Sequence, residues 1–277
     1  MVAEVLPDLS DQVVLITGAG RGLGRSAALH LARCGAVVGV ADIDGASAAE
    51  TASKARAAGG AAHSFACDVS GQKAFAAMAA DFAERCGRID AVINNAALLK
   101  YEPVESVTEE TVDRMLGAGF KSAIWGSQAL VRHMRPDVGG SIINLSSPVI
   151  VRGYPNTLVY SAIKSAVTSL TRTLAAELGP RKIRVNAVAP GSVPTPGALG
   201  INDAAEYERR ARTIPLRRLG RESDNDKALA FLLSRFVPFP PSSPIAISSP
   251  TSPRRATLIT APKYRPRAMS SRMTLQT

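Results

Sequence analysis

Tyr160 and Lys164 stand four residues apart in the stretch VYSAIKSAV, residues 159–167. Positions i and i+4 of a helix share one face, so both side chains would point the same way. A phenol with a pKa of about 10 is a poor base near neutral pH, and a neighbouring ammonium group favours its phenolate. The pair is therefore a candidate for acid–base chemistry, in which Lys164 would lower the pKa of Tyr160 by ~2–3 units.

A second candidate is the glycine-rich stretch that follows the apolar run VVLIT. It comprises Thr17, Gly18, Arg21, Gly22, Leu23 and Gly24, and a helical pattern follows it directly. Glycines let the backbone pass close to a pyrophosphate and leave helix N-terminal amides free to bind it. A glycine-rich turn without a ligand is the alternative, but the strand before and the helix after favour nucleotide binding.

Asp42 ends the next apolar run and lies 18 residues beyond Gly24. An acidic side chain there can accept hydrogen bonds from the adenosine ribose hydroxyls, and it would repel a 2′-phosphate. At an effective dielectric of ~20 and a separation of ~4 Å, one such charge pair costs about 4 kcal/mol. Arg21 could instead attract that phosphate. Because Asp42 would lie directly against the ribose, the sequence predicts NAD in preference to NADP.

These residues need a scaffold, and the pattern of apolar residues predicts one. Six short runs, mostly rich in Val and Ile, are typical of strands buried on both faces. They cover residues 13–17, 36–41, 61–69, 89–96, 140–146 and 183–190, and helix candidates lie between them at 22–34, 45–58, 70–86, 109–134 and 156–178. Alternation of strand and helix predicts an α/β fold, a doubly wound parallel sheet of the Rossmann type in a single three-layer domain.

The chain changes character after residue 234. Residues 235–277 contain eight of the 18 prolines, seven serines and no Gly, Asp or Glu. Prolines cannot supply the amide donors of a central strand, so we expect a dinucleotide-binding domain over 1–234 and an extended or disordered tail over 235–277. The abrupt change in composition after residue 234 suggests a shifted reading frame or a replaced terminus.

The net charge of +10 belongs mainly to this tail, because its seven Lys and Arg leave 26 basic against 23 acidic residues in 1–234. A basic tail could bind nucleic acid or another acidic surface, but its aromatic residues are only Phe236, Phe239 and Tyr264, a poor stacking surface. We therefore expect no nucleic-acid partner.

The remaining composition limits the function classes. The three cysteines form no CxxC motif, and the three histidines lie far apart in sequence, so no metal site is predicted. No apolar run approaches ~20 residues and the N-terminus does not have the pattern of a signal peptide, so we expect a soluble protein in the cytoplasm, without membrane contact.

In order along residues 10–234, the motifs resemble those of the short-chain dehydrogenase/reductase family. They are TGAGRGLG at 17–24, DV at 68–69, NNAA at 94–97, Ser147, YSAIK at 160–164 and PGSVPT at 190–195. The resemblance implies hydride transfer between NAD(P) and an alcohol or carbonyl substrate, commonly by a homodimer or homotetramer. Tyr160 would exchange the proton, Lys164 would also bind the nicotinamide ribose, and Ser147 would hydrogen-bond the substrate oxygen. Ser146 is an alternative to Ser147.

The same resemblance implies further cofactor contacts. Asp68 and Val69 would meet the adenine, although Asp68 could also cap the following helix. Asn95 and Ala96 would line the cofactor. Pro190, Gly191, Val193 and Thr195 would pass the nicotinamide. Residues 197–216 would form a mobile lid that sets the substrate, which the sequence does not identify.

Three departures from the family pattern stand out. Ala97 replaces a glycine, and Gly119 stands where the family has an asparagine that helps hold a proton-relay water. A helix bulge and backbone carbonyls could serve instead. Nothing in 235–277 resembles the family's last strand, so we expect an uncovered sheet edge. These departures keep a second hypothesis open, a protein that binds NAD with weak or no catalysis.

Overall fold

A computed structural model describes residues 6–199, 203–234 and 246–248 of the chain, and these residues form a sheet of seven parallel strands. The strand order is β3-β2-β1-β4-β5-β6-β7. The strands are β1 (Val13–Thr17), β2 (Val37–Asp42), β3 (Ala61–Ala66), β4 (Ala91–Asn94), β5 (Gly140–Leu145), β6 (Ile183–Ala189) and β7 (Ala246–Ser248). The predicted doubly wound sheet is therefore confirmed.

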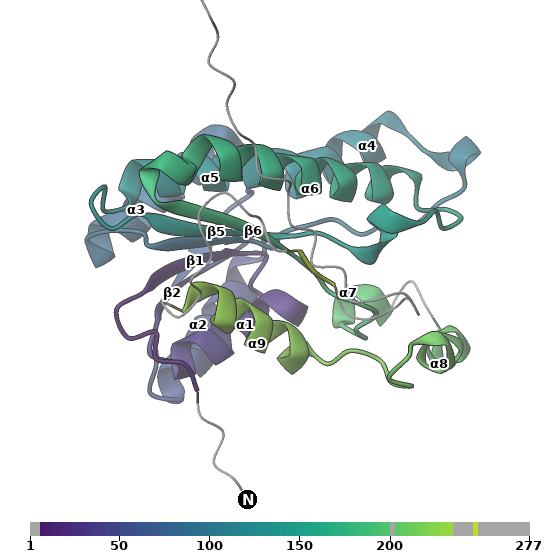
Figure 1. Cartoon of the computed structure of the whole chain (residues 1–277), viewed down its shortest axis with the longest axis horizontal. Coiled ribbons are helices and arrows are strands. Elements are labelled where there is room, and N and C mark those ends of the chain that lie inside the picture. The colour runs from purple at the N-terminus through teal and green to yellow at the C-terminus, as the bar shows by residue number, and fades with distance from the viewer. Residues whose placement is uncertain (1–5, 200–202, 235–245, 249–277) are drawn as a thin grey trace, which may run out of the picture.

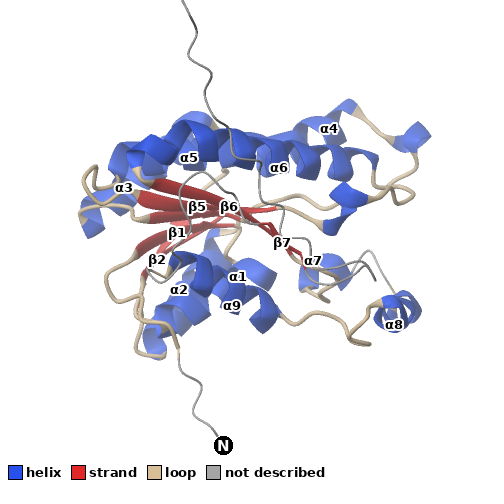
Figure 2. Cartoon of the chain, in the orientation of Figure 1, coloured by secondary structure: helices blue, strands red, loops and turns tan. Residues whose placement is uncertain are grey.

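Helices cover both faces of the sheet and give three layers (Figures 1 and 2). On one face lie α1 (Gly22–Arg33), α2 (Gly45–Ala57) and α9 (Glu222–Leu233). On the other lie α3 (Gln72–Cys86), α5 (Ser122–His133) and α6 (Leu158–Leu178). Shorter elements are α4 (Glu109–Leu116), α7 (Pro196–Leu199), α8 (Ala204–Thr213) and the 3₁₀ turns Val104–Ser106, Pro148–Val151 and Gly179–Arg181.

The core forms as two large apolar clusters, one on each face of the sheet, and a smaller third cluster of Met115, Ile163 and Val167. Every residue of β1 and β4 is buried, as expected for parallel strands covered on both sides. Phe75 and Phe82 of α3 are fully buried, and each contributes about 2–3 kcal/mol of hydrophobic stabilisation. This rigid sheet fixes the carboxyl ends of its strands, where the predicted site residues lie.

The helix expected over residues 109–134 is present but is not α-helical throughout. A π-helical turn, Gly117–Lys121, separates α4 from α5. The apolar pattern continues across this turn, so the sequence alone predicted one helix. The bulge considered as a consequence of Gly119 is therefore present in the structure.

The expectation of an uncovered sheet edge is wrong. Ala246–Ser248 forms the edge strand β7 and pairs in parallel with β6, with Ala187 opposite Ala246 and Ala189 opposite Ser248. Three residues between two prolines, Pro244 and Pro250, are enough for a short edge strand, because an outer strand needs ladder hydrogen bonds on one side only. The other residues of the predicted tail lie outside the described residues.

Asp226 of α9 is a buried carboxyl group in the contact between α9 and α1, with 3% of its surface exposed. The Ser26 hydroxyl donates to Oδ2 at 2.6 Å, while the buried Oδ1 has no hydrogen-bond partner among the described residues. Burial raises the pKa of Asp226 to about 6, the Ser26 hydrogen bond and the charge of Arg33 oppose the rise, and Glu222 adds to it. The carboxylate is therefore disfavoured in the folded chain.

We expect Asp226→Asn to stabilise the protein at pH 8 and not at pH 4. Because the folded pKa of about 6 exceeds the ordinary value of 3.8, the contribution of Asp226 is most favourable below pH 3.8 and is lost as the pH rises through 6. The gain at pH 8 should be about 2 kcal/mol, measured by urea denaturation at both pH values. Equal gains at pH 4 and pH 8 would contradict this account of Asp226.

Candidate active site

The loops that follow β1 and β4 meet at the carboxyl edge of the sheet. The Thr17 hydroxyl accepts hydrogen bonds from the backbone amides of Asn95 and Ala96, each at 3.1 Å. In return, the Asn95 side-chain amide donates to the carbonyl oxygens of Thr17 and Gly18 at 2.9 and 3.0 Å. The chain leaves β1 toward one face of the sheet and leaves β4 toward the other. Such a divergence opens a crevice at the carboxyl ends of the two strands, and ligands of open α/β sheets bind in this crevice.

The glycine loop leaves backbone amides available to a ligand. Gly22 has φ +55°, a left-handed conformation that favours glycine, and a Cβ on Gly24 would collide with the Gly18 carbonyl oxygen. Arg21 occupies the N-cap of α1 without a side-chain cap, its side chain is exposed, and the first turn of α1, which contains Leu23, has no acidic residue. An uncapped helix N-terminus with close backbone approach fits a pyrophosphate.

The stretch after β6 returns to this loop. The Thr195 Cβ lies 3.4 Å from the position that a Cβ on Gly22 would take. The Thr195 amide donates to the Val193 carbonyl at 2.9 Å, and Pro190 and Gly191 are partly buried beside them in the chain. The structure thus brings the predicted 190–195 segment and the glycine loop together.

Asp42 lies at the end of β2, underneath the glycine loop. Its Oδ2 accepts the Gly20 amide at 2.8 Å, and its Oδ1 accepts the Asp44 amide at 3.0 Å. A Cβ on Gly20 would lie 2.8 Å from Oδ2, so this approach requires glycine. The carboxylate is half-buried and keeps lone pairs for further donors.

Asp68 and Val69 follow β3, next to the end of β2. Cys67 donates its amide to the Asp42 carbonyl at 2.8 Å, which joins the two strand ends. Asp68 is exposed and accepts the Ser70 amide at 2.9 Å, whereas α3 begins later, with Gly71 as its N-cap. Val69 is 7% exposed and packs in the core. Asp68 therefore caps the turn ahead of the helix.

Ser147, Tyr160 and Lys164 come together above the end of β5. Tyr160 and Lys164 share one face of α6, with the Lys164 Nζ 5.8 Å from the Tyr160 ring centre. The Ser147 side chain lies close enough to Tyr160 to lower the pKa of its phenol. Ser146 points elsewhere, because its hydroxyl pairs with the Thr168 hydroxyl at 2.6 Å. This geometry favours Ser147 over Ser146 as the partner of Tyr160.

The electrostatics of the pair differ from the expectation. Burial raises the pKa of Tyr160 to about 12, and hydrogen bonding to Ser147 opposes the rise. Burial lowers the pKa of Lys164 to about 8, and its Nζ donates to the Leu145 carbonyl at 2.6 Å. In the protein chain alone, desolvation outweighs the effect of the ammonium on the phenol. A lower Tyr160 pKa requires additional positive charge, such as that of oxidised nicotinamide.

Lys164→Met should make the folded protein more stable at pH 7. The folded pKa of about 8 lies below the ordinary 10.5, so folding carries a penalty below pH 8 that disappears as the pH rises to 10.5. After allowing for the lost bond to Leu145, we expect a gain of about 2 kcal/mol in the free energy of unfolding. Guanidinium denaturation at pH 7 and pH 10 tests this, since a gain that persists at pH 10 would have another cause.

Neither Gly119 nor Ala97 strains the site. Non-glycine residues with positive φ occur within the described chain only at Asn156, Lys182 and Arg217, so Ala97 has an ordinary backbone conformation. Gly119 is buried in the π-helical turn, and a Cβ there would lie 3.0 Å from the Ile163 Cγ2. A larger side chain at position 119 therefore requires Ile163 to move.

The structure adds residues that the sequence analysis missed. The centres of the Tyr101 and Tyr160 rings lie 5.7 Å apart. Beneath the site, the Asn94 side chain donates to the Asn144 Oδ1 at 2.8 Å, and Asn144 donates to the Thr171 hydroxyl at 2.9 Å. The sequence analysis assigned a role to Asn95, the second asparagine of the NNAA motif. It is the first asparagine, Asn94, whose hydrogen bonds join β4, β5 and α6. No spacing pattern in the sequence links Asn94 to Asn144.

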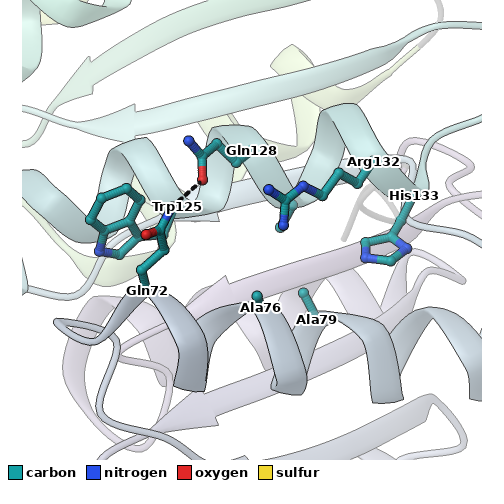
Figure 3. A pocket seen from close by; sticks show the side chains of 8 residues that line it. Gln72, Ala76, Ala79, Trp125, Gln128, Arg132 and His133 are labelled. Atoms are coloured by element: carbon teal, nitrogen blue, oxygen red, sulfur yellow. Dashed lines mark hydrogen bonds between the residues drawn. The ribbon is translucent and has the colours of Figure 1, made fainter.

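A separate small pocket lies between α3 and α5 (Figure 3). Gln72 donates to Gln128 at 3.0 Å across this seam, and Trp125, Arg132 and His133 line it. Its volume of about 10 Å³ is at the lower limit of what one water molecule needs. The pocket shares no residue with the site described above.

None of the helices in the described residues is long and apolar enough to cross a membrane. The described residues also contain no group of three or more His, Cys, Asp or Glu side chains that could hold a metal ion.

Known proteins resemble this chain over most of its length. The sequence profile of the family described as enoyl-(acyl carrier protein) reductase matches residues 18–239. Cyclopentanol dehydrogenase of Comamonas is 32% identical over 241 residues, 86% of this chain and 96% of that protein.

Solved structures agree with this. A candidate short-chain alcohol dehydrogenase from Sinorhizobium meliloti has a TM-score of 0.82 and 35% identity, over 88% of this chain and 96% of its own. A 7α-hydroxysteroid dehydrogenase, solved with NADH and 7-oxoglycochenodeoxycholic acid, has a TM-score of 0.79 and 29% identity, over 82% and 89%.

Proposed function

The chain belongs to the short-chain dehydrogenase/reductase family, as an NAD(P)-dependent oxidoreductase acting on CH–OH groups, and from that premise we propose that it interconverts a secondary alcohol and a ketone with NAD. The observation that carries the proposal is the convergence of Ser147, Tyr160 and Lys164 at the strand edge that also bears the glycine loop. A nicotinamide cofactor, when bound, supplies or accepts the hydride.

Tyr160 acts as the general acid and base. In the direction of oxidation it takes the proton of the substrate hydroxyl, and in reduction it returns that proton to the carbonyl oxygen. Ser147, which lies beside Tyr160, donates to the substrate oxygen. A Lys164 pKa of about 8 leaves the ammonium and the neutral amine both accessible near neutral pH, so Lys164 can pass a proton onward.

Asp42 supports NAD as the preferred cofactor. Its two backbone hydrogen bonds hold the carboxylate at the base of the glycine loop, where an adenosine ribose would lie. Gly18, Gly22, Leu23 and Gly24 bind the pyrophosphate through their backbone. Thr195, Val193 and the 190–191 backbone hold the nicotinamide end, and Asp68, Val69, Asn95 and Ala96 line the adenine half.

The family and the composition support further proposals. Family members are commonly oligomeric, so we expect a homodimer or homotetramer. The three cysteines form no disulfide, which fits a reducing compartment such as the cytoplasm.

The first experiment is thermal unfolding with excess NADH or NADPH, followed by assays with a panel of alcohols and NAD⁺. A ligand that binds only the folded state must raise Tm, so a rise with NADH alone supports both the site and the preference for NAD. Turnover of any alcohol then separates an active enzyme from the weakly catalytic alternative suggested by Gly119. A Tm rise with NADH and no turnover on the whole panel would contradict the catalytic proposal.

A further inference from the structure

Ser146 lies directly before Ser147 at the carboxyl end of β5 and is buried, with 5% of its surface exposed. Its backbone amide donates to the Val188 carbonyl at 2.8 Å, so its main chain is fixed to the neighbouring strand β6. Its hydroxyl pairs with the hydroxyl of Thr168, on helix α6, at 2.6 Å. The proposed function gives this pair of buried hydroxyls no role.

The direction of the hydrogen bonds in this pair follows from the number of protons available. Thr168 Oγ1 lies 2.8 Å from the Lys164 carbonyl oxygen, which can only accept, so Thr168 donates its one proton there. Ser146 is then the donor to Thr168. The Ser146 hydroxyl lies 3.5 Å from the same carbonyl oxygen, a distance at which a direct hydrogen bond is weak. The two hydroxyls therefore act in series on the backbone of Lys164.

The side chain of Lys164 is held by the same strand end. Its Nζ donates to the Leu145 carbonyl at 2.6 Å, and the main chain leads from Leu145 directly to Ser146. The hydrogen bonds then run through Thr168 back to the Lys164 carbonyl, which closes a ring. Ser146, Lys164 and Thr168 are each at most 8% exposed, so water competes little with these bonds.

This ring joins the two elements that carry the candidate catalytic side chains. Ser147 follows β5, whereas Tyr160 and Lys164 lie on α6, so the three side chains meet only while strand end and helix keep a fixed separation. Lysine carries its charge on a flexible four-carbon stem, which does not hold a position by itself. A misplacement of about 1 Å can lower a rate by 10²-fold.

We propose that Ser146 and Thr168 are positioning residues, whose paired hydroxyls hold the backbone of Lys164 against the end of β5 and so keep its amine on the Leu145 carbonyl, beside Tyr160. This inference rests on the proposed function, because the pair acts through Lys164. It gives Ser146 a role different from the substrate contact that the sequence analysis left open for it.

The first test compares Thr168→Val, which keeps the shape of threonine without its hydroxyl, with Thr168→Ser, which keeps the hydroxyl. Thr168→Val should lower kcat about tenfold and weaken NADH binding, measured from Tm shifts, about threefold. Thr168→Ser should stay within about twofold of the wild type in both quantities. Assays are run well below the ligand-free Tm of each protein, so that a loss of stability does not enter the rates.

The titration of Lys164 in the ligand-free protein is an independent readout. Burial lowers the pKa of Lys164 to about 8, and Tyr160 is the titratable group that faces its amine among the described residues. A hydrogen bond to the Leu145 carbonyl favours the ammonium, so loosening this bond in Thr168→Val should lower the pKa of Lys164 further, by about half a unit. NMR of ¹³C-labelled lysine measures it, and Lys164→Met identifies the signal.

Thr173→Val is the matched control. Thr173 lies on the same helix, and its hydroxyl donates to the Ser169 carbonyl, four residues earlier, at 3.3 Å, but its side chain is exposed. The variant removes the same kind of bond outside the ring. We expect kcat and NADH affinity to stay within about twofold of the wild type, and the titration of Lys164 to stay unchanged.

Ser146→Ala and the double variant with Thr168→Val test the pairing itself. Because either change opens the same ring, the double variant should lose about as much kcat as Thr168→Val alone. Losses that multiply would mean that the two hydroxyls act separately. A loss above about 10²-fold in Ser146→Ala, with Thr168→Val unaffected, would return Ser146 to direct contact with the substrate. Either result would overturn the inference.

Two further results would also overturn it. They are an unchanged kcat and Lys164 titration in Thr168→Val, and equal changes in Thr168→Val and Thr173→Val. Since the lysine titration and NADH binding need no turnover, their loss in Thr168→Val and recovery in Thr168→Ser support the inference even if no alcohol is oxidised. Absence of turnover in the wild type would count against the proposed catalysis alone.

Discussion

Tyr160→Phe should lower kcat for alcohol oxidation by about 10²–10⁴-fold while NADH still raises Tm as in the wild type. General acid–base groups contribute rate factors of this size, and phenylalanine keeps the ring that packs beside Tyr101. The hydroxyl removed is the one whose pKa the neighbouring Ser147 lowers. Steady-state kinetics with NAD⁺ and the best alcohol of the panel give kcat, and thermal unfolding gives cofactor binding.

Tyr154→Phe is the control for this prediction. It deletes the phenol hydroxyl of a tyrosine that is not part of the cluster formed by Ser147, Tyr160 and Lys164. It should alter kcat by less than about threefold. If Tyr160→Phe retained more than about a tenth of the wild-type kcat, another group would be the acid and base. A loss of the NADH-induced Tm rise would instead indicate that Tyr160 acts mainly in cofactor binding.

Asp42→Ala should raise the ratio of kcat/KM with NADP⁺ to that with NAD⁺ by about a hundredfold. Removing the carboxylate relieves the repulsion of a 2′-phosphate, estimated at about 4 kcal/mol before solvent screening of this half-buried group reduces it. Part of the change should be a weaker NAD⁺ affinity, because the amides of Gly20 and Asp44 lose their acceptor.

Asp44→Asn provides the control for charge. It removes one negative charge two residues away and keeps an oxygen for the amides of Ala46 and Ser47 that cap α2. The NADP⁺/NAD⁺ ratio should then change by less than about threefold. An Asp44→Asn effect as large as that of Asp42→Ala would mean that overall charge, and not the position of Asp42, sets the cofactor preference.

Local patterns predicted the scaffold well. The alternation of apolar runs and helices placed β1–β6 within three residues of their observed ends, because buried parallel strands and their crossovers leave a strong periodic signal. The i and i+4 spacing likewise put Tyr160 and Lys164 on one helix face. Both inferences concern residues close in sequence, where backbone geometry alone decides the outcome.

Non-local features were beyond prediction from one sequence. The approach of Tyr101 to Tyr160 depends on how two separate segments pack. The pKa of Tyr160 depends on desolvation by that packing, which outweighs the nearby ammonium. β7 was missed for a different reason, since proline-rich composition argues against strands although three residues suffice at an edge.

The π-helical turn Gly117–Lys121 has a consequence for how this chain can change in evolution. Such a turn holds one residue more than the α-helical turn it replaces, and its wider winding absorbs the rotation of about 100° that this residue would otherwise add between α4 and α5. Deleting one residue at the turn should therefore restore regular α-helical geometry and keep the face of α5 that bears Gly126, Ala129 and Leu130 in the core. The same deletion within α5 would rotate that face away from the core, so selection should tolerate a change of length at the π-helical turn and eliminate it in the regular part of the helix.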